Sequence, residues 1–342
     1  MVRLRLDAQT TPSWVAVGLF ALMFAGGSLA YDGFFAGQVF LNLLIDNAFL
    51  LVVAIGMTFV ILSSGIDLSV GSVVALTTML LAWGVERAHL SPWLLVPLLL
   101  AGGALYGAAM GWIVQRFEIP AFIVTLAGMF FARGLCYLVS IDSIAITDPV
   151  LAGWSQARLP VGPMGEVSPG VVVAAVALAA AVWLAHGTPF GRTVYAIGGN
   201  ERSALLMGLP VARTRIAVYA ISGLCAALGG VLFGTYTLSG YGLHAQGLEL
   251  DAIAATVIGG ALLTGGVGYV AGTVTGVLML GVIQTLIMFD GTLSSWWTRI
   301  AIGALLGLFC VLQRAIELLQ RARPAAPPAP GGARLDPSPH PR

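Results

Sequence analysis

The chain has 342 residues and a formal net charge of +1, with 58% hydrophobic residues, 9% charged residues and a mean hydropathy of +0.94. This composition predicts a polytopic membrane protein. The positive residues are arginines scattered over polar segments rather than gathered on one basic face, which argues against a nucleic-acid partner. The three cysteines stand far apart in apolar segments and the histidines are isolated, so the sequence favours neither a disulfide framework nor a metal site.

Apolar segments that suit membrane spans follow one another along the chain. A helical span needs about 20 mostly apolar residues. The ten predicted segments lie at 13–32, 40–62, 71–85, 93–114, 120–139, 170–186, 216–236, 252–268, 269–289 and 296–313. The third and the eighth are short and glycine-rich, which is typical of discontinuous or re-entrant segments. The predicted fold class is therefore all-α, with a transmembrane domain at 13–316 built from about ten helices, some of them broken.

The chain contains no lysine, so arginine alone reports the orientation of the loops. Positive residues accumulate on cytoplasmic loops. If the N-terminus is inside, most arginines lie on the cytoplasmic side, whereas Arg87, Arg158 and Arg299 lie outside. The sequence therefore predicts two cytoplasmic ends, residues 1–12 before the first span and a disordered proline-rich tail at 317–342 after the last.

A short break that carries one carboxylate follows the second predicted span. Gly65 and Gly71 bracket this break, and Asp67 lies between them. A charge inside the bilayer costs about 2.5 kcal/mol or more, and irregular backbone at that depth needs protein or a water-filled cavity around it. The pattern therefore predicts a broken helix near a polar pathway. A second interpretation stays open, in which the carboxylate caps free amides near Ser69 at the start of the next helix.

Few hydrogen-bonding side chains within the predicted spans could face a transport pathway. The candidates are Asp46, Asn47, Asp67, Ser69, Thr125, Gln284 and Thr285. An alternative for Asp46 and Asn47 is that they tie neighbouring helices together through interhelical hydrogen bonds. The same alternative applies to Gln284.

The polar stretch at 187–215 is predicted to be a cytoplasmic loop that contains a short amphipathic helix. Asn200 is a suitable helix N-cap and Gly208 a suitable stop. The predicted apolar face consists of Ala204, Leu205 and Met207. Such a helix could lie on the lipid interface or dock into a groove on a soluble partner.

Three of these features together resemble a known family. The break at 65–71, the loop at 195–208 and the segment at 249–254 are similar to the permease subunits of bacterial carbohydrate ATP-binding-cassette (ABC) importers of the ribose type. The resemblance covers residues 13–316. Within the family, the second permease of galactofuranose importers is most similar, on the stretches 46–50, 56–62, 119–123, 125–131 and 290–298. Ser64 departs from the family pattern, in which a second glycine usually precedes Gly65.

The resemblance implies a multi-pass subunit of the bacterial inner membrane that imports a monosaccharide, galactofuranose or a related sugar. It implies three partners: an ABC ATPase subunit, a second permease chain and a periplasmic sugar-binding protein. A homodimer and a heterodimer both stay open, and the resemblance favours a related, non-identical partner. The matching position of the family's coupling helix assigns ATPase coupling to Asn200, Glu201, Arg202, Ala204, Leu205 and Gly208.

The chain itself is expected to hold no cofactor and to catalyse no reaction. A P-loop needs a lysine that reaches the nucleotide phosphates, so ATP is expected to be hydrolysed by the partner subunit. A proton-coupled secondary sugar transporter is the first alternative, because Asp46 and Asp67 are acids of the kind that proton relays use. An intramembrane enzyme is disfavoured, since no clustered nucleophile, base or metal ligands are evident. A non-transporting scaffold is a third alternative.

Overall fold

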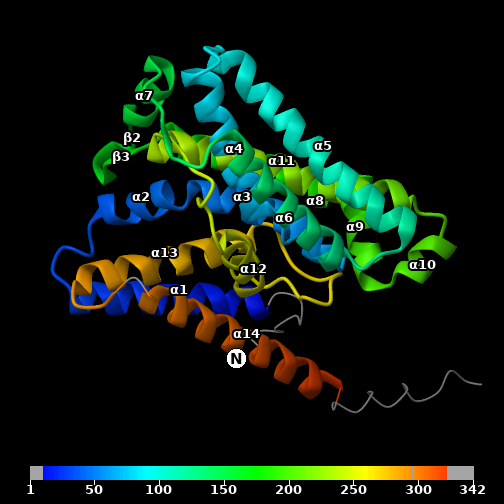
Figure 1. Ribbon diagram of the computed structural model, residues 1–342. Helices are drawn as coiled ribbons and strands as arrows, with labels where there is room; N and C mark the ends of the chain where they lie inside the picture. The colour runs from blue at the N-terminus through cyan, green and yellow to red at the C-terminus, as the bar shows by residue number, and fades with distance from the viewer. Residues whose placement is uncertain (1–10, 295, 322–342) are drawn as a thin grey trace, which may run out of the picture.

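The computed structural model describes the backbone of residues 11–294 and 296–321, with side chains for 14–294 and 296–311. Residues 1–10 of the predicted N-terminal segment, and the predicted tail beyond Arg321, lie outside this description. Long helices run side by side along one common direction (Figure 1). The first half contains α1 (Thr11–Ala30), α2 (Gly37–Asp46), α3 (Ala48–Leu62), α4 (Val70–Glu86), α5 (Pro92–Phe117) and α6 (Ala121–Val139).

The second half begins with a loop region and continues with six longer helices and one short one. The loop region contains β1 (Ile144–Ala145), α7 (Pro149–Gln156), β2 (Leu159–Pro160), η1 (Gly162–Met164) and β3 (Glu166–Val167). The remaining elements are α8 (Pro169–Gly187), α9 (Pro189–Gly199), α10 (Glu201–Leu206), α11 (Val211–Thr237), β4 (Ser239–Gly240), α12 (Leu248–Ile258), α13 (Gly272–Asp290) and α14 (Trp296–Arg321). The prediction of an essentially helical chain is confirmed, apart from strands of two residues each that form two small antiparallel pairs, β1–β4 and β2–β3.

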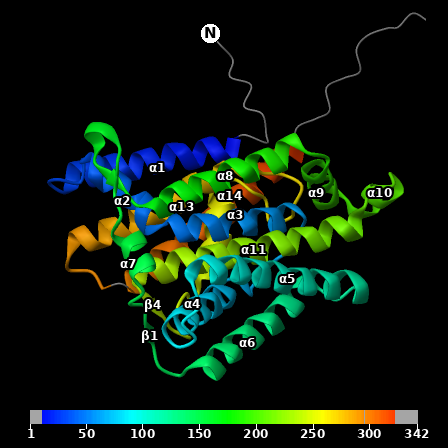
Figure 2. The same cartoon turned by 90° about the horizontal axis from the view of Figure 1, so that it is seen from above.

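Helices α3 and α11 form the centre of the bundle. Almost every side chain of α3 is buried, and α11 packs against α3, α4 and α5. Glycines bring α5 and α11 into backbone contact, because a Cβ on Gly107 would lie 2.0 Å from the Tyr219 carbonyl oxygen and one on Gly223 would lie 2.1 Å from that of Gly103. Small residues at a crossing allow this close approach in membranes, where packing drives helix association. Figure 2 shows α6 on the flank of the bundle opposite α1.

Two chain breaks lie where the sequence predicted irregular backbone, and a third was not predicted. Residues 63–69 separate α3 from α4, and residues 259–271 separate α12 from α13. The predicted span at 40–62 is also divided, because α2 and α3 meet at Asn47 with a bend of 56°. The Asn47 side-chain amide donates to the Leu43 carbonyl oxygen at 2.9 Å, so a side chain provides a hydrogen bond to a backbone carbonyl group in the last turn of α2.

Fewer helices than the ten predicted are long enough to cross a membrane. Within the described residues, α5, α6, α8, α11 and α13 are long and apolar enough, and the bent pair α2–α3 makes a sixth. Three apolar helices are shorter, namely Trp14–Ala30 within α1, α4, and Trp296–Val311 within α14. The predicted span at 252–268 is helical only to Ile258. The count of ten therefore stays a prediction.

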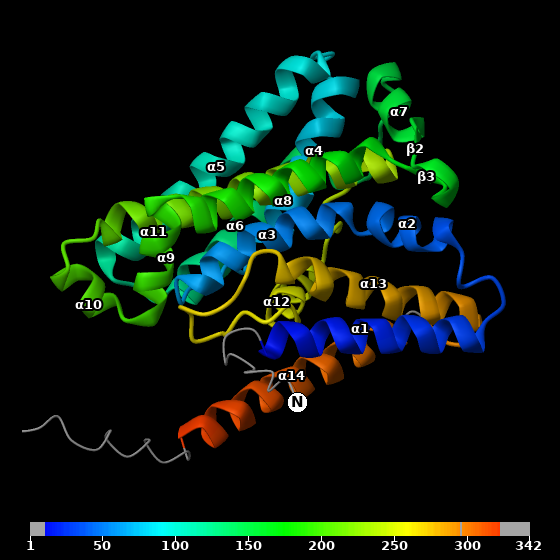
Figure 3. The same ribbon diagram turned by 180° about the vertical axis from the view of Figure 1, so that it is seen from behind.

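The two ends of the bundle differ in structure. Helix α10 and the α5–α6 turn lie at one end, whereas α7, β2 and β3 lie at the other (Figures 1 and 3). At the second end the carboxylate of Glu86 accepts hydrogen bonds from the backbone amides of Thr147 and Asp148 and from the Thr147 hydroxyl. This carboxylate fixes the loop region to the end of α4.

Candidate functional site

Helix α10 begins and ends as the sequence predicted. The Asn200 Oδ1 atom accepts a hydrogen bond from the Ser203 amide at 2.8 Å, which caps the helix. Gly208 follows the last turn with a φ of +74°, a left-handed conformation that glycine adopts without steric cost. The helix therefore has a defined geometry although it is only six residues long.

The predicted apolar face of α10 is divided in the structure. Ala204 is fully buried against Ile197 and Val211, so it packs on its own protein. The exposed apolar side chains are Leu205 at 55%, Leu206 at 89% and Met207 at 66%. The prediction that Ala204, Leu205 and Met207 share one face is wrong, because Ala204 is buried whereas Leu205 and Met207 are exposed, and the helix ends at Leu206 before Met207. We refer to Leu205, Leu206 and Met207 as the exposed apolar patch.

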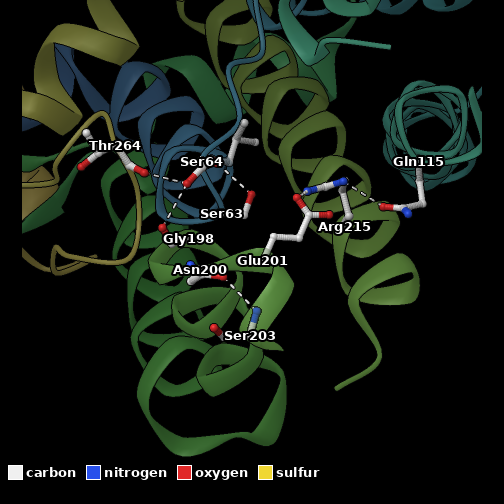
Figure 4. Close-up of polar contacts among 10 residues, drawn as sticks. Ser63, Ser64, Gln115, Gly198, Asn200, Glu201, Ser203, Arg215 and Thr264 are labelled. Atoms are coloured by element: carbon white, nitrogen blue, oxygen red, sulfur yellow. Dashed lines mark hydrogen bonds and ion pairs between the residues drawn. The ribbon is translucent and has the colours of Figure 1, made fainter. Parts of the chain in front are cut away.

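An ion pair joins α10 to the transmembrane bundle. Arg215 of α11 lies 2.7 Å from the Glu201 carboxylate and also donates to the side-chain oxygen of Gln115 on α5 at 3.0 Å. Figure 4 shows this chain of side chains from α10 through α11 to α5. Arg202 is exposed on the same helix.

Three segments that are distant in sequence meet beside α10. The Ser64 hydroxyl lies 2.7 Å from the Thr264 carbonyl oxygen and 3.2 Å from that of Gly198 (Figure 4). The Gly266 amide donates to the Leu62 carbonyl oxygen at 3.0 Å. We call these five residues the inner junction. It joins the break after α3, the end of α9 and the loop between α12 and α13.

Glycine is required at the inner junction because the backbones touch. A Cβ on Gly198 would lie 1.9 Å from the Leu62 carbonyl oxygen and 2.3 Å from the Gly266 nitrogen. Gly266 itself has a φ of +74°. By contrast, a Cβ on the neighbouring Gly199 would meet no atom within 4 Å. Of these two adjacent glycines, Gly198 is therefore the one that cannot carry a side chain without a clash.

A second contact ties α9 to the loop between α12 and α13. The Tyr195 hydroxyl donates to the Gly268 carbonyl oxygen at 2.8 Å. Burial, together with the nearby Tyr269, raises the pKa of Tyr195 to about 12. The phenol is therefore neutral and a hydrogen-bond donor throughout the physiological pH range.

A polar cavity of about 480 Å³ opens beside these contacts. It lies between α10, α11, the α5–α6 turn and the break after α3. Ser64, Gln115, Glu201, Leu205 and Arg215 are among its lining residues. The side chains that link α10 to the bundle therefore border open space rather than a packed interior.

The acid of the break, Asp67, is fully buried, and the hydrogen bonds it accepts come from its own chain. One carboxylate oxygen accepts from the Ser69 amide at 2.9 Å and from the Ser69 hydroxyl at 2.6 Å. The other oxygen accepts from the Ser222 hydroxyl of α11 at 2.7 Å. Both predicted pathway residues of this break, Asp67 and Ser69, are thus bonded to each other, and the carboxylate fastens the break to α11.

Most of the remaining pathway candidates also bond within the chain. Asn47 and Thr125 are buried and donate to carbonyl oxygens four residues earlier on their own helices, and Thr285 does the same. Asp46 is exposed and accepts from the Tyr236 hydroxyl at 2.9 Å. This contact joins α2 to α11. It agrees with the alternative interpretation, in which Asp46 ties neighbouring helices together.

Gln284 has a different environment. It lines a cavity of about 520 Å³ between α12, α13 and α14, which we call the α12–α14 cavity. Arg299 of α14 lies 3.2 Å from both carboxylate oxygens of Asp251 of α12 in the wall of this cavity. Ile287 and Met288 add an apolar surface. The cavity therefore combines an amide, an ion pair and apolar side chains.

Residues 39–310 match a family model that is described as the permease component of branched-chain amino acid transport systems. The chain belongs to this permease family. The permease is 49% identical to the inner membrane ABC transporter permease protein YjfF of Escherichia coli (strain K12), over 93% of this chain and 96% of the relative. No solved structure matches it significantly.

Two further relatives carry the names of sugars. The fructose import permease protein FruG of Bifidobacterium longum (strain NCC 2705) is 36% identical to the permease, over 91% of this chain and 93% of the relative. The ribose import permease protein RbsC of Escherichia coli (strain K12) is also 36% identical, over 78% of this chain and 83% of the relative.

Sequence reasoning missed the pairing of two charged residues, Asp251 and Arg299, which joins α12 to α14. Asp251 and Arg299 are 48 positions apart, so no spacing rule indicated their pairing. Arg133 of α6 donates to the carbonyl oxygens of Gly242 and His244 at 2.7 and 2.8 Å, which holds the segment before α12. A charged residue within or beside an apolar segment was the available signal for each of them.

Proposed function

We propose that this permease is a membrane-spanning subunit of an ATP-driven sugar importer in the bacterial inner membrane. Family membership supports a transport permease, and the names of the fructose and ribose import permeases support a sugar as its substrate. The observation that carries the proposal is the exposed apolar patch on α10, because this helix is anchored by the Glu201–Arg215 ion pair yet presents apolar side chains outward. Its expected partners are an ABC ATPase subunit, a second permease chain and a periplasmic sugar-binding protein.

The proposed orientation places α10 in the cytoplasm. The arginine distribution supports cytoplasmic ends and about ten transmembrane segments, counting the shorter apolar helices and the broken ones. In this orientation α7 and the β2–β3 pair face the periplasm. The binding protein would then deliver its sugar at the end of the bundle opposite α10.

The exposed apolar patch is the proposed contact with the ATPase. Fully burying one Leu or Met side chain contributes about 1.5–3 kcal/mol, so a groove on the ATPase would bind this patch. Asn200 and Gly208 shape the helix, whereas Glu201 transmits its position to α11 through Arg215. The partner supplies ATP hydrolysis, and the chain itself needs no bound cofactor.

The α12–α14 cavity is the proposed sugar pathway on this subunit. Charged side chains in membrane domains face protein or water-filled cavities rather than lipid. Arg299 is half exposed and Asp251 is paired with it, so this face of the bundle suits a water-filled route or the second permease. The amide of Gln284 and the ion pair can donate to and accept from sugar hydroxyls. The substrate that the sequence favours is galactofuranose or a related monosaccharide.

Uptake by vesicles that contain the complete importer tests this proposal. Leu206→Glu places a charge in the exposed apolar patch, and we expect normal membrane insertion with loss of ATPase binding and of uptake. Leu159→Glu is the matched control for ATPase binding, which it should retain, because Leu159 is an exposed leucine in the loop region at the opposite end from α10. Normal uptake by Leu206→Glu would contradict the proposal, as would sugar accumulation by the permease alone in response to a proton gradient.

A further inference from the structure

We infer that Ser64 is a positioning residue that connects the coupling helix α10 to the wall of the sugar pathway. This inference rests on the proposed function. Through its hydroxyl, Ser64 determines how much of the ATP-driven movement of α10 reaches α12 and α13. The observation behind this inference is the pair of contacts that the Ser64 hydroxyl makes with the carbonyl oxygens of Gly198 and Thr264 (Figure 4).

The backbone of Ser64 directs its side chain into the inner junction. Its φ is +60°, in the left-handed region where residues other than glycine are uncommon. The hydroxyl has one proton and lies within reach of two carbonyl oxygens, 2.7 Å from Thr264 and 3.2 Å from Gly198. A strained backbone at this point therefore coincides with a side chain that contacts two other segments.

The two carbonyl groups belong to segments with different proposed tasks. Gly198 is in the last turn of α9 and lies two positions before Asn200, the N-cap of α10. Thr264 lies in the loop that connects α12 with α13, and both helices line the α12–α14 cavity. Ser64 itself follows α3 in the break that Asp67 fastens to α11. One hydroxyl thus meets the coupling segment, the pathway segment and the central bundle.

Backbone contacts at the inner junction support the same connection. The Gly266 amide bonds to the Leu62 carbonyl oxygen, and the close approach of Gly198 to both groups leaves no room for a side chain. A displacement of α9 must therefore push on the break and on the loop together. Ser64 can be changed without overfilling this contact, because it is exposed and borders the polar cavity of about 480 Å³.

The neighbouring serine provides a matched control. The Ser63 hydroxyl donates to the Val60 carbonyl oxygen of its own helix at 2.8 Å, so its bond links no separate segments. Ser64→Gly removes the bridging hydroxyl and is compatible with the positive φ. Ser64→Ala removes the same hydroxyl but retains the Cβ atom. A comparison of these variants with Ser63→Ala separates the bridging contact from loss of a serine hydroxyl in general.

The experiment measures ATP hydrolysed per sugar imported, in vesicles that contain the complete importer with its sugar-loaded binding protein. Loss of one hydrogen bond changes a conformational equilibrium about five-fold, so we expect Ser64→Gly and Ser64→Ala to raise this ratio by about that factor. We expect Ser63→Ala to leave the ratio unchanged. Thermal unfolding of each purified importer verifies that all three variants assemble normally.

The outcomes distinguish failure of this inference from failure of the proposed function. If the wild-type importer shows no ATP-dependent sugar uptake, the proposed function fails. If wild type is coupled and Ser64→Ala retains the wild-type ratio, the role of the hydroxyl is overturned, even if Ser64→Gly alone is uncoupled through a more flexible backbone. An equal increase in Ser63→Ala would likewise overturn it.

Discussion

The break around Asp67 and the α12–α14 cavity both place acids in the membrane domain, but they use them differently. The Asp67 carboxylate is fully buried, and both of its oxygens accept hydrogen bonds from within the fold, from Ser69 and from Ser222. Asp251 is paired with a half-exposed arginine in the wall of a cavity. An acid in an apolar segment therefore does not by itself mark a pathway. Its partners and its access to open space decide that role.

We expect the largest effect, a loss of stability, from substitution of Asp67, the buried acid of this comparison. Asp67→Leu would leave the Ser69 amide and the Ser69 and Ser222 hydroxyls without their acceptor. An unsatisfied buried group costs about 1–3 kcal/mol, so we expect destabilisation by about 3 kcal/mol or more and poor membrane insertion. Thermal unfolding of the detergent-purified permease measures this effect.

Asp67→Asn sharpens the interpretation of that result. The variant retains an acceptor oxygen but loses the charge, so we expect transport with moderately reduced stability. Complete loss of uptake in a folded Asp67→Asn variant would indicate that the charge itself works in transport, contrary to a structural role for Asp67.

The next largest effect is expected at the inner junction. Gly198→Ala would place a methyl group 1.9 Å from the Leu62 carbonyl oxygen, whereas Gly199→Ala meets no atom within 4 Å. Overpacking costs about 1–3 kcal/mol, so we expect reduced thermal stability and impaired uptake for Gly198→Ala alone. Equal behaviour of the two variants would contradict the close packing of this region.

A smaller effect, on transport rather than on stability, is expected at the α12–α14 cavity. Gln284→Leu removes an amide that faces the cavity, so we expect an increase of about ten-fold in the sugar concentration for half-maximal uptake. Thr285→Val is the control, because Thr285 bonds to the Gly281 carbonyl oxygen of its own helix. Unchanged uptake kinetics in Gln284→Leu would remove Gln284 from the pathway.

The smallest effect is expected from the contact between Tyr195 and Gly268. Tyr195→Phe removes one hydrogen bond, so we expect a loss of about 1 kcal/mol of stability. Because the pKa of Tyr195 is raised from 10.0 to about 12, its contribution is fully present below pH 10 and is lost as the pH rises towards 12. Denaturation of wild type and Tyr195→Phe at pH 7 to 9 should show a constant difference.

Local structure was predictable where short-range chemistry decides it. Asn200 caps α10 and Gly208 ends it because both effects depend on groups within a few residues. The break before α4 was predictable because glycines and an acid interrupt an apolar run. The bend at Asn47 was missed, since the apolar runs on both sides of Asp46 and Asn47 predict one continuous helix.

The candidate site was only partly predictable, because its side chains come from several helices that are distant in sequence. Gln284 was among the pathway candidates, but its environment depends on Asp251 and Arg299, which come from two other helices. The sequence also placed Ala204 on the same face as Leu205, although packing against Val211 turns Ala204 inward. Such contacts depend on how helices pack rather than on spacing along one of them.

The sequence by itself determined that this chain is a membrane permease, where α10 begins and ends, and that a break separates α3 from α4. These properties follow from apolar composition, from glycines and caps that act over a few residues, and from long stretches of similarity. The tertiary structure decided which polar groups are consumed within the fold and which remain accessible, because hydrogen bonds such as that from Ser222 to Asp67 join residues 155 positions apart. It also brought Ser64, Gly198 and Thr264 together, since three separate chain segments must pack before one hydroxyl can touch the other two.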